Sequence, residues 1–272
     1  IINEINNDLK SDYKMFRLLQ GDVGSGKTIV SLIAAANVIK SNWQATIMAP
    51  TEILAKQHYN LAKKIFSSTN VNIAFLSGTS HPSEKKLIQK NLLDGKINLL
   101  IGTHALFQKN ISFKKLGLAI IDEQHKFGVK QRIELSKKGG KDCDILLMSA
   151  TPIPRTLVLT VYGDMDISKL TEKPMYRKDI ITLSKPEEKI NEILSFIDKE
   201  IKNGNQVFWV CPLIEESKKL DYSAAVVKYK FLSKKFNNKV GLIHGGLDKE
   251  ERNTILNKFL NKTINILVST TV

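Results

Sequence analysis

Short apolar runs alternate with amphipathic stretches along the first part of the chain. Runs that are apolar at nearly every position are typical of strands buried on both faces of a parallel sheet. This pattern predicts strands at Phe16–Gln20, Thr46–Ala49, Asn72–Leu76, Leu99–Ile101, Leu118–Ile121 and Ile145–Ser149. The amphipathic stretches between them predict helices at Lys27–Lys40, Glu52–Phe66, Ser83–Asp94 and Lys130–Lys137. Such an alternation predicts an α/β domain with a parallel sheet.

A second series of the same kind follows a break at Glu172–Tyr176, where Pro174 interrupts both periodicities. Its predicted strands are Asp179–Leu183, Val207–Val210, Val240–Ile243 and Ile264–Val268, and its predicted helices are Glu187–Asn203, Ala224–Phe236 and Lys249–Leu260. Asp248, with Glu251 three residues later, resembles a capping box at the start of the last helix. We therefore predict two α/β domains, residues 1–175 and 176–272, the second incomplete at its carboxyl-terminal end.

Length and composition agree with two globular domains and exclude several classes of protein. The 272 residues suffice for two cores, and 42% hydrophobic with 25% charged residues is a globular balance. No apolar run approaches the roughly 20 residues of a membrane span, and no signal peptide is visible. Cys143 and Cys211 give neither a disulfide framework nor a paired metal spacing. We expect a cytoplasmic protein without a metal site made only of side chains, and without a membrane partner.

The formal net charge of +14 has two interpretations. A basic protein attracts polyanions, and phosphate contacts would bind nucleic acid without sequence preference. Alternatively, a coding bias toward lysine explains the charge. Lysine is spread over the whole chain rather than gathered in one patch, as such a bias predicts. Charge alone does not decide between them.

The strongest motif is a glycine-rich loop between a predicted strand and a predicted helix. Its residues match G-x-x-x-x-G-K-[ST] and are Gly21, Asp22, Val23, Gly24, Ser25, Gly26, Lys27 and Thr28. Glycines let the backbone curl so that successive N–H groups point at phosphate oxygens, and the helix that follows adds its positive dipole end. We expect Lys27 to reach the β- and γ-phosphates and the Thr28 hydroxyl to bind Mg²⁺.

An acidic box follows the predicted strand Leu118–Ile121, with the residues Asp122, Glu123, Gln124 and His125. Open α/β sheets bind ligands at the carboxyl ends of their strands. We therefore expect Asp122 to hold Mg²⁺, and Glu123 to orient or deprotonate the attacking water. Gln124 and His125 could equally satisfy local backbone groups.

The acidic box resembles the DExH box of superfamily-two helicases, and three further segments resemble motifs of the same proteins. Ala49–Glu52 and Gly102–Leu106 resemble motifs that touch the nucleic-acid backbone, and Ser149–Pro152 resembles the motif that links nucleotide state to domain movement. The resemblance implies DNA contacts at Pro50, Thr51, Thr103 and His104, and coupling roles for Gln124, His125, Ser149 and Thr151. Considered by themselves, these residues have simpler roles: Thr51 would cap a helix, and a lone histidine after a strand is more often structural.

Longer matches resemble the RecG family in particular. They lie at Gly21–Thr28, Asp122–Arg132, Ser149–Leu157, Tyr162–Asp166, Cys211–Ser217 and Gly241–Leu247. The transcription-repair coupling factor shares some of these features and is an alternative. The resemblance implies two RecA-like domains of an ATP- and Mg²⁺-dependent DNA helicase that remodels branched DNA in recombination and repair. It further implies sequence-independent binding of branched or duplex DNA, a monomer, and a bacterial-type cytoplasmic protein associated with the nucleoid.

The resemblance also bears on what the chain can do alone. The family's wedge domain, adenine-reading glutamine and arginine finger have no counterpart in this sequence, so we expect a piece of a longer protein that hydrolyses ATP poorly by itself. Two other classes compete with the helicase hypothesis. One is a P-loop kinase or GTPase, and a GTPase would carry Asn-Lys-x-Asp, which does not occur here. A basic nucleic-acid-binding module without catalysis would tolerate the loss of Lys27.

Overall fold

The chain divides into two compact units, Ile1–Asp179 and Ile180–Val272, and each is described by itself. The structure, a computed structural model, describes residues 1–107, 111–123, 143–151, 165–172, 180–211, 218–237 and 239–270. The predicted domain boundary at residues 175/176 and the predicted helix Lys130–Lys137 lie outside these ranges.

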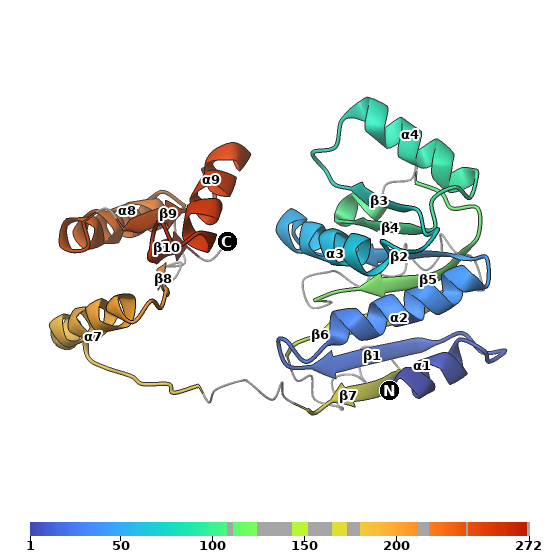
Figure 1. Cartoon of the computed structure of the whole chain (residues 1–272), viewed down its shortest axis with the longest axis horizontal. Helices are drawn as coiled ribbons and strands as arrows, with labels where there is room; N and C mark the ends of the chain where they lie inside the picture. The colour runs from blue at the N-terminus through green and yellow to red at the C-terminus, as the bar shows by residue number, and fades with distance from the viewer. Residues whose placement is uncertain are drawn as a thin grey trace. The chain divides into compact units, whose positions relative to one another are not determined.

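The first unit is built on a seven-stranded sheet in which every pair of neighbours is parallel. The strand order is β3-β4-β2-β5-β6-β1-β7, which Figure 1 shows from top to bottom. The strands are β1 (Phe16–Gly21), β2 (Gln44–Met48), β3 (Ile73–Leu76), β4 (Leu99–Gly102), β5 (Leu116–Ile121), β6 (Asp144–Ser149) and β7 (Asp166–Leu170). Because all are parallel, their carboxyl ends lie along one edge, which we call the carboxyl edge.

Helices cover both faces of this sheet. One face packs against α1 (Ile2–Asp8), α2 (Lys27–Lys40) and α3 (Glu52–Ile65), and the other against α4 (Pro82–Leu93) and the 3-10 helix η1 (His104–Phe107). Successive residues of the central strand β5 face opposite cores: Leu118 and Ile120 lie in the first, Ala119 and Ile121 in the second. Burial on both sides explains why the strands are almost continuously apolar.

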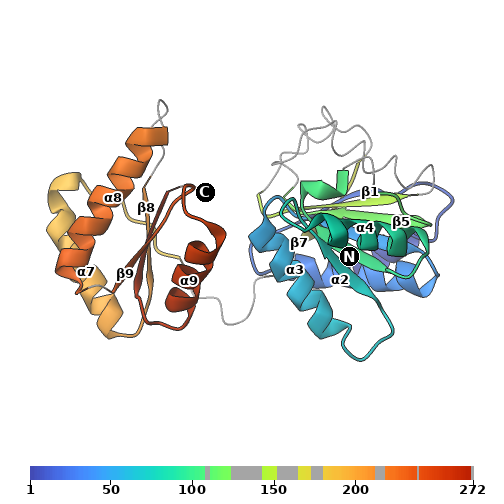
Figure 2. The ribbon, with the colours of Figure 1, turned by 90° about the horizontal axis from the view of Figure 1, so that it is seen from above.

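The second unit has a three-stranded parallel sheet in the order β8-β10-β9. Helices α7 and α8 pack on one face and α9 on the other, as Figure 2 shows. The elements are η4 (Glu187–Lys189), α7 (Ile190–Lys202), β8 (Val207–Cys211), α8 (Lys218–Lys235), β9 (Val240–Ile243), α9 (Lys249–Leu260) and β10 (Ile266–Thr270). The predicted cap of α9 is confirmed, because the Glu251 backbone N–H donates to Asp248 Oδ1 at 2.8 Å.

The predicted strand Asp179–Leu183 is wrong over its described residues, 180–183, which form no strand. Its apolar side chains are exposed: Ile180 by 75%, Ile181 by 83% and Leu183 by 76%. Apolar alternation marks a strand only where a neighbour supplies the hydrogen-bonding partners, and none of the described strands pairs with this segment.

Three described elements were not predicted: helix α1, strand β7 and the short 3-10 helix η1. Helix α1 is polar, with Ile5 as its one buried residue, so it lacks an apolar stripe. Strand β7 is an edge strand that pairs only with β1 among the described strands, and of its residues only Ser168 is buried. Its exposed side therefore shows no apolar pattern.

Gly102, at the end of β4, is a position where we expect alanine to destabilise the first unit. A Cβ there would overlap the backbone carbonyl oxygen of Leu76, which accepts a hydrogen bond from the Thr103 N–H. Backbone must move to make room, so Gly102→Ala should cost about 3 kcal/mol in urea-induced unfolding. Gly78→Ala is the matched control, because its nearest neighbour would be His104 Nε2 at 3.9 Å. Equal stability of the two variants would contradict the close approach of Gly102 to the Leu76 carbonyl oxygen.

Candidate nucleotide site at the carboxyl edge

The glycine-rich loop connects the end of β1 to the start of α2. Gly24 and Gly26 have φ angles of 80° and 94°, in the left-handed region that glycine adopts without strain. The ammonium of Lys27, the first residue of α2, donates to the carbonyl oxygens of Gly21 at 2.7 Å and Asp22 at 3.0 Å. A curled loop before a helix N-terminus, with a lysine folded over it, forms an anion site suited to phosphate groups.

Gly21 allows the loop to pack closely against its surroundings. A Cβ at this position would lie 2.5 Å from Ser25 Oγ and 2.8 Å from Leu170 Cβ. Within the described part of the chain, the buried Ser25 hydroxyl has no hydrogen-bond partner. A cavity of about 440 Å³ opens beside it, lined in part by Ile2, Val30 and Leu170. The glycine-rich loop therefore adjoins an open space.

Asp122 and Glu123 lie at the same edge, directly after β5. Only β6 separates β5 from β1 in the sheet, which places the two strand ends about 10 Å apart. Asp122 is buried, with 8% of its surface exposed, and its Oδ2 lies 2.7 Å from Nε2 of His58. Glu123 has a φ of 49°, a left-handed conformation that non-glycine residues seldom adopt and that is concentrated at functional sites.

The residues after β6 form a hydrogen-bonded turn that is tied to β1. Ser149 Oγ lies 3.1 Å from Thr151 Oγ1 and accepts from the Thr151 N–H at 3.2 Å. Gln20, the residue before Gly21, donates from Nε2 to the Thr151 carbonyl oxygen at 3.1 Å. The end of the phosphate-loop strand is thus joined directly to the Ser149–Thr151 turn. Gln20 was not predicted as a site residue, because its partner lies 131 positions away along the chain.

The four residues predicted to contact DNA follow β2 and β4 at the same edge. Thr51 caps α3, because its Oγ1 accepts from the Leu54 N–H at 3.3 Å, so the simpler reading of this residue is confirmed. Pro50 is half-buried beside it. Thr103 is buried, and its Oγ1 lacks a hydrogen-bond partner among the described residues, while His104 is exposed and opens η1. Gln124 and His125 lie outside the described residues.

Oxygen groups suited to Mg²⁺ are present in this arrangement. Magnesium prefers hydroxyl, carboxylate and water oxygens. The Thr28 side chain is half-buried beside the loop, and Asp122 offers a buried carboxylate. No group of three or more His, Cys, Asp or Glu side chains that could hold a metal ion occurs anywhere among the described residues, and both cysteines are buried and free. The residues predicted to bind a triphosphate and its ion therefore gather at the carboxyl edge.

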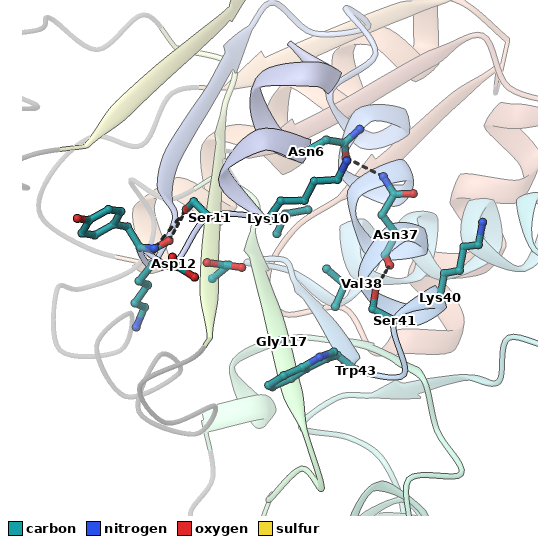
Figure 3. A pocket seen from close by; sticks show the side chains of 14 residues that line it. Asn6, Lys10, Ser11, Asp12, Asn37, Val38, Lys40, Ser41, Trp43 and Gly117 are labelled. Atoms are coloured by element: carbon teal, nitrogen blue, oxygen red, sulfur yellow. Dashed lines mark hydrogen bonds between the residues drawn. The ribbon is translucent and has the colours of Figure 1, made fainter.

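A larger cavity, of about 710 Å³, lies at the opposite edge of the sheet. Figure 3 shows Trp43 and Gly117 at its wall, and Asn37 donating to Asn6 Oδ1 at 2.7 Å. Asp144, at the first position of β6, also lines it. None of the predicted site residues lines this cavity, so its size does not mark the nucleotide site.

Asp144 is expected to make stability depend on pH. Burial raises the pKa of its carboxyl from 3.8 to about 6, against a backbone hydrogen bond from Met15 that lowers it. Between these values the folded state binds the proton more tightly than the unfolded state, so stability falls as pH rises. Asp144→Asn retains an acceptor for Met15 and should raise Tm by roughly 2–4 °C at about pH 8.

Thermal unfolding at about pH 8 and about pH 4 measures this effect. The gain of the Asp144→Asn variant should shrink at the lower pH, where the carboxyl of the folded wild type is protonated and no longer carries a buried charge. Asp94→Asn serves as a control on a more exposed carboxylate. A gain of the same size at both pH values would contradict the raised pKa.

The fold defines a class of protein: the chain has the P-loop NTPase fold with two RecA-like α/β domains, as predicted. The chain belongs to the DEAD/DEAH box helicase family, whose sequence model matches residues 4–159. The model of the helicase conserved C-terminal domain matches residues 188–272.

The predicted resemblance to RecG is confirmed. The chain is 48% identical over 271 residues to ATP-dependent DNA helicase RecG of Thermotoga maritima, and 47% identical over 274 residues to that of Bacillus subtilis. These matches cover 99% and 100% of this chain but 35% and 40% of the two relatives. The solved structure of RecG bound to a three-way DNA junction is 44% identical, with a TM-score of 0.77, and the match covers 99% of this chain and 35% of that one.

No described helix is long and apolar enough to span a membrane.

Proposed function

We propose that this chain forms the ATP-driven motor of a DNA helicase or translocase that remodels branched DNA in recombination and repair. One observation carries the proposal: the glycine-rich loop and the Asp122–Glu123 pair lie at the same edge of one sheet, with a single strand between them. Residues at two strand ends separated by one strand, about 10 Å apart, can act on one bound triphosphate.

Each group at this edge has a proposed role in ATP binding and hydrolysis. The backbone of Gly21–Thr28 and the Lys27 ammonium hold the phosphates, and the nucleoside extends toward the cavity beside Ser25. Thr28 and Asp122 hold Mg²⁺, which neutralises phosphate charge when it is bound. Glu123 orients the attacking water and accepts its proton.

Movement along DNA is proposed to use the remaining residues of the carboxyl edge. Pro50, Thr51, Thr103 and His104 contact the sugar-phosphate backbone, which positions the protein without reading the base sequence. Ser149 and Thr151, together with Gln124 and His125, transmit nucleotide state between domains 1–175 and 176–272. The hydrogen bond from Gln20 to Thr151 supports this coupling, because it joins the phosphate-loop strand to the turn. We further propose a monomer that works on chromosomal DNA in the cytoplasm, associated with the nucleoid.

The preference for branched DNA is supported by a relative, since the similar RecG structure is bound to a three-way junction. The test is ATP hydrolysis by the complete gene product with linear, forked and four-way DNA of equal length. Stronger stimulation by forked and four-way DNA is expected. Equal stimulation by all three would overturn the branched-DNA specificity, and no stimulation by any of them would overturn the motor function.

A further inference from the structure

His58 lies in the middle of α3 and contacts the carboxylate of Asp122. The distance from Nε2 to Oδ2 is 2.7 Å, and both residues are buried, with 7% and 8% of their surfaces exposed. A carboxylate has only acceptor atoms, so Nε2 is the donor in this pair. The contact joins a helix on one face of the sheet to the end of β5.

The hydrogen bonds of Asp122 fix how its carboxylate is turned. Oδ2 accepts from His58, and Oδ1 accepts from the Glu123 backbone N–H at 3.0 Å. The Asp122 N–H donates to the Met48 carbonyl oxygen at 2.8 Å, which fixes the backbone. Each carboxylate oxygen can accept two hydrogen bonds, and the described residues use one position on each, which leaves a second position on each for a hydrated ion as far as these residues go.

Packing alone gives no reason for an imidazole at this position. The other buried residues of α3 are Ala55 and Ala62, one turn before and one turn after His58. Burying a polar pair costs desolvation energy, and apolar replacements of such pairs are often neutral or stabilising. What His58 adds is a fixed direction for the carboxylate. Partners of this kind orient metal-binding carboxylates in other proteins.

We propose that His58 is a positioning residue, which holds the Asp122 carboxylate in the orientation that the magnesium ion of bound ATP requires. The inference rests on the proposed function, because it takes Asp122 as the Mg²⁺-binding residue. His58 itself touches neither the nucleotide nor the ion. Its loss therefore weakens the contribution of the ion to nucleotide binding, and leaves binding without the ion unchanged.

The test compares the binding of a fluorescent, non-hydrolysable ATP analogue in Mg²⁺ and in EDTA, using the complete gene product. The measured quantity is the ratio of the two Kd values, which isolates the contribution of the ion. Three substitutions at residue 58 separate the effect of the hydrogen-bond donor's position from the effect of side-chain size. His58→Gln can place an amide nitrogen where Nε2 lies, His58→Asn is too short to reach Asp122, and His58→Leu removes the donor. Ala62→Gly weakens the same helix without touching Asp122.

We expect the ratio of the Kd in EDTA to the Kd in Mg²⁺ to fall at least about 10-fold in His58→Asn and His58→Leu. The ratio for His58→Gln should stay close to that of the wild type. Ala62→Gly should keep the full ratio, and all variants should bind the analogue alike in EDTA. A wild-type ratio in His58→Asn would overturn the positioning role even if the leucine variant fails to fold. Absence of nucleotide binding by the wild type would instead overturn the proposed function.

Discussion

Exchange of Glu123 for glutamine is expected to slow ATP turnover about 10³-fold while ATP still binds. The two side chains have the same shape, but the amide accepts no proton from the attacking water. The phosphate loop belongs to β1 and α2, so its contacts with the triphosphate remain intact. Steady-state phosphate release in the presence of DNA measures turnover, and equilibrium titration with a fluorescent ATP analogue measures binding.

The control for this variant is Glu188→Gln. Glu188 is an exposed glutamate in η4 of the second unit, so the same chemical change there should leave turnover within about twofold of wild type. Wild-type turnover by the Glu123 variant would remove this residue from the proposed catalytic role. A parallel loss of ATP binding would show that the substitution disturbed the loop rather than the chemistry.

Strands that are buried on both faces of the sheet could be predicted from the sequence. Strand β5 has apolar neighbours on both faces, so its sequence is apolar throughout and its position could be predicted within two residues. The segment 180–183 carries the same kind of apolar residues, but the described strands offer it no pairing partner. Local patterns record what a side chain prefers, whereas a strand also requires a neighbouring backbone. Strand β7 shows the converse, because its pairing with β1 compensates for a weak apolar pattern.

The positions of the loop and the acidic pair at one edge also follow from the sequence. Each comes directly after a predicted strand, and parallel strands end at the same edge. Thr51 was predictable as a cap because capping depends on residues three positions away. The contacts of Gln20 with Thr151 and of His58 with Asp122 join residues 131 and 64 positions apart. No local pattern encodes such a pair.

One signal for His58 was nevertheless present in the sequence. Ala55, His58 and Ala62 recur at the spacing of one helix face, and that face is buried. A histidine on a buried face requires a hydrogen-bonding partner, because leaving its ring nitrogens unpaired is costly. The strand order then identifies the partner, since β2 leads into α3 and pairs directly with β5. Helix periodicity combined with the observed order of the strands identifies Asp122 as that partner.

Replacement of Lys27 by alanine is expected to reduce ATP turnover at least about 10²-fold, and to weaken ATP binding, without loss of DNA binding. The Lys27 ammonium is the positive charge that lies over the phosphate loop, held there by the carbonyl oxygens of Gly21 and Asp22. The proposed DNA contacts at Thr51 and His104 follow other strands, β2 and β4, and do not depend on it.

Lys40→Ala is the matched control for this variant, because it removes an exposed lysine from the other end of α2. Its turnover should stay within about twofold of wild type. ATP hydrolysis and binding to forked DNA, measured side by side on both variants, separate the two classes of function that fit a basic chain. A motor loses hydrolysis and keeps DNA binding when Lys27 is replaced. A binding module without catalysis would be unaffected, and wild-type behaviour of the Lys27 variant would therefore contradict the motor.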